Sequence, residues 1–232
     1  WHHLSDRIET LYEHFEDTYI PSEILLIDHA TVLPTRRDIE TDGRIRNLLL
    51  ENPLDFHIVD TDILESGRIE NTQVHIKDIA AKIVICPPGR VVEEALEKWL
   101  SEFEQNGGTV LHVQNEDHSD ALLNRILERV QPHLSIQAKT GDLRKLQLVT
   151  RTDGNRTLYF LINSGKEALH LVFDPSLVEI PLSATSPLRL DNTECILAPF
   201  DSILLETTEA AAETQPLPQI TIPIQGEVKI LS

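Results

Sequence analysis

The chain has 232 residues, of which 41% are hydrophobic and 25% are charged, and its formal net charge is −18. This length can bury two ordinary hydrophobic cores, so we expect two domains, and the composition excludes global disorder. The excess of carboxylates excludes nucleic-acid phosphates and anionic membranes as partners, because both need clustered Lys and Arg.

The numbers of cysteines and methionines give expectations for the cellular compartment and for whether the sequence is part of a longer polypeptide. Cys86 and Cys195 lie far apart in sequence and give neither a disulfide framework nor a metal-ligand spacing, which indicates a reducing, cytoplasmic compartment. No run of about 18 apolar residues predicts a membrane span, and the N-terminus lacks a signal peptide. The chain contains no methionine, even at position 1, so we expect either a piece of a longer polypeptide or a written sequence from which modified methionines are missing.

The first sixty residues predict helices and strands in alternation. Apolar residues recur at helical spacing over residues 1–20, where Ser5 is a candidate N-cap, and this helix leads into the first domain. The apolar run 23–28 predicts a buried strand, and 56–60 predicts a second one. Residues 39–52 contain an amphipathic helix between these two strands.

Residues 79–113 give the clearest pattern in the chain. The β-branched run 82–86 predicts a buried strand that two prolines and a glycine end. From Val91 the apolar positions recur at helical spacing, and Asn106-Gly107-Gly108 supplies residues that tolerate positive φ where this helix stops. The run 109–113 predicts another strand, so the segment forms a βαβ unit with parallel strands.

Two further elements complete the first domain, which we expect to cover residues 1–140. A short excursion strand is predicted at 74–76, and another amphipathic helix at 121–130. Alternating strands and helices predict an α/β fold with a flavodoxin-like or class I glutamine amidotransferase-like parallel sheet.

The pattern changes to short strands and turns in residues 141–208, which predict a small antiparallel β-sandwich. Asp153-Gly154 lies between two apolar runs and is a hairpin signal. Residues 209–232 read as a linker followed by the start of a further strand. The strands expected in the sandwich are 146–151, 157–163, 168–173, 188–190, 195–197 and 202–206.

One catalytic hypothesis places a nucleophile at the carboxyl ends of the parallel strands, where function gathers in such sheets. His112 or His118 would activate Cys86, and Glu116 or Asp117 would orient the imidazole. However, a nucleophile elbow needs small residues around the cysteine, and two prolines follow Cys86 directly. We therefore expect a buried cysteine that acts as a small hydrophobe.

A metal hypothesis uses Asp117, His118 and Asp120, with His112 as a further ligand. The simpler explanation is that these polar side chains face solvent, and that Ser119 or Asp120 caps the helix that begins nearby. A phosphate-binding loop is excluded because the Gly-Gly pair lies between a helix and the following strand, on the wrong side for a phosphate cradle. We therefore expect no metal and no cofactor.

A sugar-binding hypothesis uses aromatic side chains as a platform. Trp1 with His2 and His3 is one candidate group, and Tyr159 and Trp99 are further candidates. The helical spacing of Trp99 predicts that its ring points inward.

Several segments follow one another in a recognisable order: Trp1 with the following helix, EILLID (23–28), LLLENPLDFHIVDTDIL (48–64), KIVICPPGRVVEEALEKWLSEFEQNGGTVLHV (82–113), RTDGNRTLYFLINS (151–164) and LAPFDSILLE (197–206). In this order they resemble the region that follows the catalytic barrel in large bacterial glycoside hydrolases. The resemblance is to family 106 α-L-rhamnosidase-like proteins and to family 42 β-galactosidases with their trimerisation domain, and it covers about residues 1–208.

This resemblance implies an amidotransferase-like domain without catalytic residues, followed by a small β-domain. It implies a non-catalytic structural or oligomerisation region of a carbohydrate-active enzyme, whose partners are the catalytic barrel of the same polypeptide, further copies of the chain and the carbohydrate substrate of the parent enzyme. The alternatives are a stand-alone carbohydrate-binding module and a hydrolase that uses Cys86 with His112 or His118.

Overall fold

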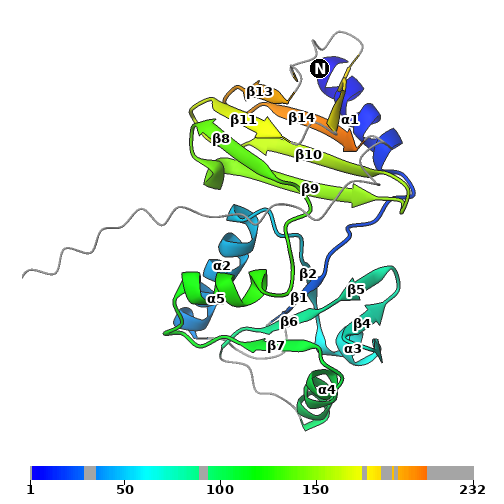
Figure 1. Cartoon of the computed structure of the whole chain (residues 1–232), viewed down its shortest axis with the longest axis vertical. Coiled ribbons are helices and arrows are strands. Elements are labelled where there is room, and N and C mark those ends of the chain that lie inside the picture. The colour runs from blue at the N-terminus through cyan, green and yellow to red at the C-terminus, as the bar shows by residue number, and fades with distance from the viewer. Residues whose placement is uncertain are drawn as a thin grey trace, which may run out of the picture.

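The structure is a computed structural model that describes residues 2–28, 35–88, 94–173, 177–183, 190 and 193–207, with side chains from Ser5 onward. The chain has a mixed α/β fold: a parallel sheet with its helices lies at one end of the molecule, and two antiparallel sheets lie at the other (Figure 1). None of the helices in the described part of the chain is long and apolar enough to span a membrane.

The parallel sheet has four strands in the order β2-β1-β6-β7, and all neighbours are parallel. Each residue of the two central strands is buried, since helices cover both faces of the sheet. One face packs against α2 and α5, and the other packs against α3 and α4. The elements are β1 (Ile24–Ile27), α2 (Arg36–Glu51), β2 (His57–Val59), α3 (Thr61–Glu65), β6 (Ile83–Cys86), α4 (Glu94–Gln105), β7 (Thr109–His112) and α5 (Ser119–Leu127).

The predicted βαβ unit is present as β6, α4 and β7, with the parallel register expected. Gly107 has φ +89°, and a Cβ on Gly108 would lie 2.2 Å from the Phe103 ring. These two glycines therefore let the chain leave α4 while Phe103, which is fully buried, fills the core beneath the turn. The predicted excursion strand belongs to a small antiparallel sheet of β3 (Arg68–Glu70), β4 (Gln73–Ile76) and β5 (Ile79–Ala81).

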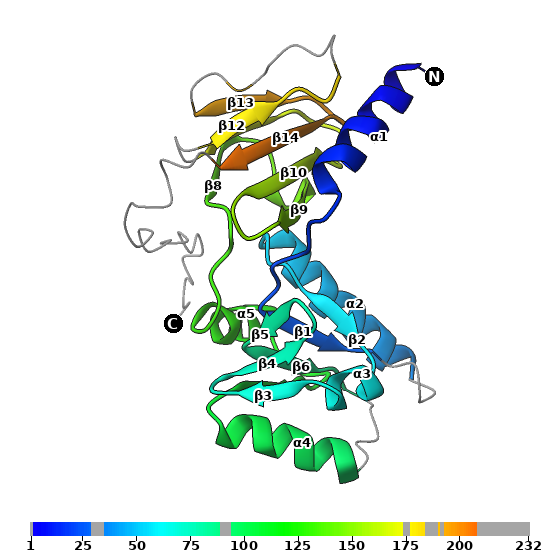
Figure 2. The same cartoon turned by 90° about the vertical axis from the view of Figure 1, so that its right-hand side faces the viewer.

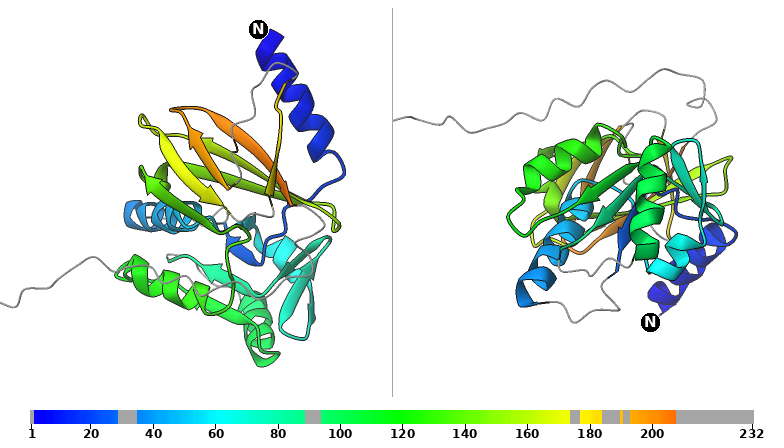
Figure 3. Two further views of the ribbon diagram at one scale, coloured as in Figure 1. Left: turned by 45° about the horizontal axis from the view of Figure 1, so that its top comes forward. Right: turned by 90° about the horizontal axis from the view of Figure 1, so that it is seen from below.

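The antiparallel part consists of two sheets that share one apolar core (Figure 3). Tyr159, Leu161 and Leu205 from one sheet meet Leu171 and Leu197 from the other. The first sheet contains β12 (Leu177–Ile180), β14 (Ser202–Thr207), β10 (Thr157–Asn163) and β9 (Leu146–Thr152), and the second contains β13 (Glu194–Leu197), β11 (Leu169–Phe173) and β8 (Ile136–Thr140).

Two segments that the sequence pattern grouped with residues 1–140 lie with the antiparallel sheets. Strand β8 pairs with β11, although its position before residue 140 grouped it with the parallel sheet. Helix α1 (His2–Phe15) packs its Leu11 and Phe15 against the apolar cluster around Leu158 and Leu204 (Figure 2). The division into domains at residue 140 stays a prediction, and these contacts favour a boundary nearer the end of α5.

Other sequence expectations differ in detail or lie elsewhere. The pattern missed β12, and the predicted strand 188–190 lies outside the described residues except for Leu190, whose amide donates to Glu179 Oε2 at 2.7 Å. Residues 209–232, predicted as a linker and a further strand, also lie outside the described residues.

Asn163 joins the two antiparallel sheets. Its Nδ2 donates to the carbonyls of Glu167 at 2.7 Å and of Leu197 and Ala198 at 3.0 Å, and its Oδ1 accepts from the Gly165 amide. The side chain is fully buried on β10, whereas Leu197 ends β13 in the other sheet. This network explains the asparagine at the end of the Tyr159-to-Asn163 strand.

We expect Asn163→Ala to lower the free energy of unfolding by roughly 2–4 kcal/mol, because the buried Leu197 carbonyl and two partly buried carbonyls lose their donor. Urea unfolding followed by circular dichroism measures this change. Asn155→Ala, in the exposed hairpin turn, is the matched control and should change the stability by less than about 0.5 kcal/mol. Equal stability of the two variants would contradict the role of Asn163.

Candidate functional site

The carboxyl ends of the parallel strands bring two of the predicted catalytic residues together. The β6–β7 register pairs Cys86 with His112, so they are neighbours on adjacent strands. Cys86 is only 4% exposed and belongs to the apolar cluster between the sheet and α4, whereas His112 is exposed. The predicted burial of Cys86 is confirmed, and the arrangement presents an imidazole to solvent beside a covered thiol.

The loop after β7 is fixed to the start of α2 by a polar network. The Thr41 hydroxyl donates to Asn115 Oδ1 at 2.8 Å, and Asn115 Nδ2 donates to Asp38 Oδ1 at 3.1 Å. Asp38 is buried and also accepts from the amide and hydroxyl of Thr35, which completes the capping box of α2. This network holds the loop in place through side chains that the catalytic hypothesis did not include.

The remaining candidates of this loop have local roles. Glu116 forms an exposed ion pair with Arg37 at 2.9 Å, and Asp117 Oδ2 accepts from the Gln114 amide at 2.7 Å. The prediction that Ser119 or Asp120 caps the next helix is wrong, because α5 begins at Ser119 and its N-cap residue is His118. The His118 side chain forms no capping hydrogen bond.

The structure does not bring these side chains together as metal ligands. Asp117 accepts a hydrogen bond within its own loop, and Asp120 lies in the first turn of α5. Across the described ranges, no three His, Cys, Asp or Glu side chains gather closely enough to hold a metal ion.

The aromatic candidates for a sugar platform are placed differently from one another. Trp1 lies outside the described residues, and His2 and His3 are described only as backbone in α1. Trp99 is half-buried, packs against the core and stacks on Phe103 with ring centroids 5.8 Å apart, so the predicted inward direction is confirmed. Tyr159 is buried, and its hydroxyl donates to a backbone carbonyl at 3.0 Å.

A groove that the sequence pattern missed lies between α2 and α5. Its volume is about 660 Å³, and Asp120 is the candidate metal ligand on its wall. Arg144 closes it from the antiparallel part and forms two 2.9 Å contacts with Asp142, which hold the pKa of that carboxyl below its usual range. The lining residues are Glu40, Gly43, Arg44, Asn47, Leu48, Glu51, Asn52, Ser119, Asp120, Leu123 and Arg144.

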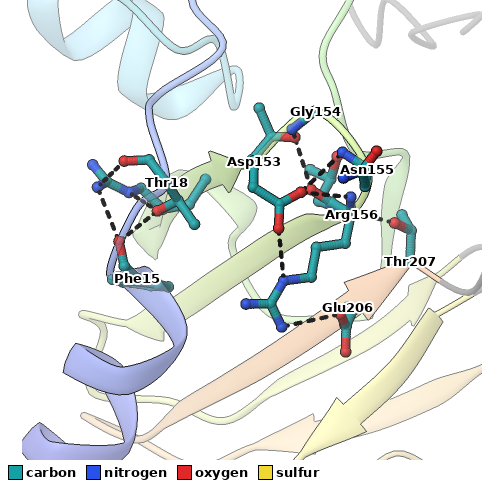
Figure 4. Close-up of polar contacts among 11 residues, drawn as sticks. Phe15, Thr18, Asp153, Gly154, Asn155, Arg156, Glu206 and Thr207 are labelled. Atoms are coloured by element: carbon teal, nitrogen blue, oxygen red, sulfur yellow. Dashed lines mark hydrogen bonds and ion pairs between the residues drawn. The ribbon is translucent and has the colours of Figure 1, made fainter.

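The end of α1 is held to β9 by a guanidinium. Arg151 donates to the hydroxyl of Thr18 at 2.8 Å and to its carbonyl at 2.7 Å, and it lies 5.7 Å from the centre of the Phe15 ring. Tyr19 and Thr152 exchange two backbone hydrogen bonds of 2.9 Å beside this contact. Figure 4 shows the polar contacts at Phe15 and Thr18. These contacts attach α1 to the antiparallel sheets.

The neighbouring hairpin turn is organised by Asp153. Its carboxylate accepts from the amides of Arg156 and Asn155, which lowers its pKa (Figure 4). Arg156 also forms an ion pair with Glu206 on β14, with 3.5 Å between Nη1 and Oε1. The predicted hairpin at Asp153-Gly154 is therefore confirmed, with Gly154 at φ +92°.

Comparison with known proteins gives matches in structure alone. No protein-family model and no curated protein matches the chain. The structure is similar to a catalytic mutant of a GH42 β-galactosidase from G. stearothermophilus, with a TM-score of 0.57 and 12% identity over 81% of this chain and 40% of that chain. It is also similar to a β-galactosidase from Bacillus circulans sp. alkalophilus, with a TM-score of 0.61 and 10% identity over 88% of this chain and 44% of that chain.

A third match is a rhamnosidase from Novosphingobium sp. PP1Y, with a TM-score of 0.56 and 12% identity over 97% of this chain and 26% of that chain. The chain thus spans less than half the length of each of these proteins. At these identities the similarity shows a shared fold with part of each glycoside hydrolase.

Burial of Cys86 predicts slow chemistry at its sulfur. In a Cys195→Ala variant, where Cys86 is the remaining cysteine, we expect alkylation at neutral pH to be far slower in the native protein than in denaturant. A cysteine introduced at exposed Lys98 is the control and should react rapidly. Rapid alkylation of native Cys86 would instead indicate an activated thiolate.

Removal of the Arg151 contacts should loosen α1. We expect Arg151→Ala to weaken the attachment of α1 by about 1–2 kcal/mol of free energy. Amide exchange in α1 should become faster, with little change in β10. Hydrogen-exchange mass spectrometry measures both segments. Arg68→Ala, which removes an exposed pair with Glu70, is the control and should leave α1 unchanged. Unchanged exchange of α1 in Arg151→Ala would contradict this attachment.

Proposed function

We propose that the chain is a non-catalytic structural region of a glycoside hydrolase. The observation that carries this proposal is the coverage: 81–88% of this chain matches 40–44% of two β-galactosidase chains. A segment that shares a fold with less than half of an enzyme is consistent with one part of a larger polypeptide. The partners that we propose are the catalytic barrel of the same polypeptide and further copies of the chain.

The finer fold assignment belongs to the same proposal. We infer a flavodoxin-like, amidotransferase-like sheet, and the strand order supports it: numbered among the parallel strands alone, β2-β1-β6-β7 is 2-1-3-4. In such sheets ligands bind outside the carboxyl ends of the strands. Here the cysteine at the end of β6 is covered by α4, which supports a domain that retains the scaffold without a nucleophile.

One observation favours a second candidate, a hydrolase that uses Cys86 and His112. The two residues are register neighbours, and a thiol beside an imidazole is the arrangement that a cysteine nucleophile needs. Substrate could reach the sulfur only after movement of the residues that cover it. The alkylation rate of Cys86 separates this candidate from the structural one.

The purified chain should not hydrolyse aryl glycosides. We expect no nitrophenol release above the buffer rate from nitrophenyl β-galactoside or α-rhamnoside, because the described residues offer a buried thiol in place of an open catalytic site. An active β-galactosidase is the positive control, and circular dichroism verifies that the chain is folded. Robust hydrolysis that survives repurification would refute the structural proposal.

A further inference from the structure

Two segments join the parallel sheet to the antiparallel sheets (Figure 2), and they contact each other between the two parts. One runs from α1 to β1, and the other runs from α5 to β8. His133 Nε2, in the second segment, lies 2.6 Å from the Pro21 carbonyl in the first. His57 Nε2, on β2, lies 3.3 Å from the Ile20 carbonyl. We call the residues around this contact, 20–22 and 131–135, the joint.

Asp55 lies beside the joint, just before β2. The Ser22 hydroxyl donates to the Asp55 carbonyl at 2.9 Å, which ties Asp55 to the first segment. Its carboxylate faces Thr150 on β9, so it lies between the two parts of the molecule. Asp55 Oδ2 and the Thr150 hydroxyl are both buried and complete no hydrogen bond. Thr150 still acts on the carboxylate in favour of its ionised form, but burial opposes the charge more strongly.

The electrostatics of Asp55 follow from this geometry. Burial raises its pKa above the ordinary value of 3.8, while Thr150, His133 and His57 act in the opposite direction. Among the described residues, these two histidines are the titratable groups whose charge acts on Asp55, one from β2 and one from the second joining segment.

We propose that this cluster is an acid-sensitive joint: the two parts of the molecule are held closely when Asp55 carries a proton and separate more readily when Asp55 is ionised. The protonated carboxyl can donate a hydrogen bond inside the joint, whereas the carboxylate is better solvated when the joint opens. The joint is built from this chain alone, so it stands independently of any glycoside hydrolase function.

The sign of the pH effect follows from linkage. Because the pKa of Asp55 is raised in the folded protein, its contribution to stability is fully present below the ordinary aspartate value and is lost as pH rises through the raised value. Acid therefore tightens the joint until general acid unfolding begins.

Distances between spin labels across the joint test this inference. Labels on cysteines introduced at Lys98 in α4 and Lys166 between β10 and β11 report on the two parts, and Cys86 and Cys195 are buried. We expect the distance distribution to narrow as pH falls from 8 to 4 while circular dichroism stays native. Asp55→Asn should give a narrow distribution throughout, because the amide carries no charge.

Two further variants complete the design. Asp78→Asn changes an exposed carboxylate and should respond to pH like the parent protein. His133→Gln keeps a side-chain donor but removes the imidazole, and it should retain most of the response. A pH-independent distribution in the parent protein, an unaltered response in Asp55→Asn, or loss of the response only in His133→Gln would each overturn the assignment to Asp55.

Discussion

The α/β part of the molecule depends on the burial of β1 and β6 on both faces. Strands with apolar side chains on both sides cannot face water, so they require helices above and below the sheet. Leu26 and Ile85 point toward α2 and α5, while Leu25 and Val84 point toward α3 and α4. This requirement places every helix of that part. It also leaves Cys86, the last residue of β6, under α4 as part of the apolar layer.

Much of this architecture is visible in the sequence, because burial on one face leaves a periodic signal. The 82–86 run, the spacing of Leu96, Leu100 and Phe103, and the Asn-Gly-Gly turn predict β6, α4 and the turn into β7. The hairpin at Asp153-Gly154 is likewise local. By contrast, the pattern of α1 gives its apolar face but not the surface that receives it. Strand β8 alternates half-buried Ile136 and Ala138 with exposed Gln137 and Lys139, but so short a pattern does not indicate that β11 is its partner.

The candidate site was predictable only in part for the same reason. Strand order puts Cys86 and His112 at one edge, and the two prolines indicate that the sulfur is covered. The contacts that fix the neighbouring loop join Asn115 to Asp38 and Thr41 across more than seventy residues, and no local pattern marks them. Asp55 and Thr150 likewise meet only because the two parts of the fold are placed against each other. Polar contacts between distant segments need the tertiary structure.

The attachment of α1 has a mechanical consequence. Arg151 and the Tyr19–Thr152 bridge attach the helix to β9, so we expect α1 to move together with the antiparallel sheets. Any rotation between the two parts would bend the residues between Tyr19 and β1 and those that follow α5, and it would shift the contact of α2 with β9. A force applied to α1 therefore acts first on the antiparallel sheets, and it reaches the parallel sheet through the joining segments and through α2, which packs against β9.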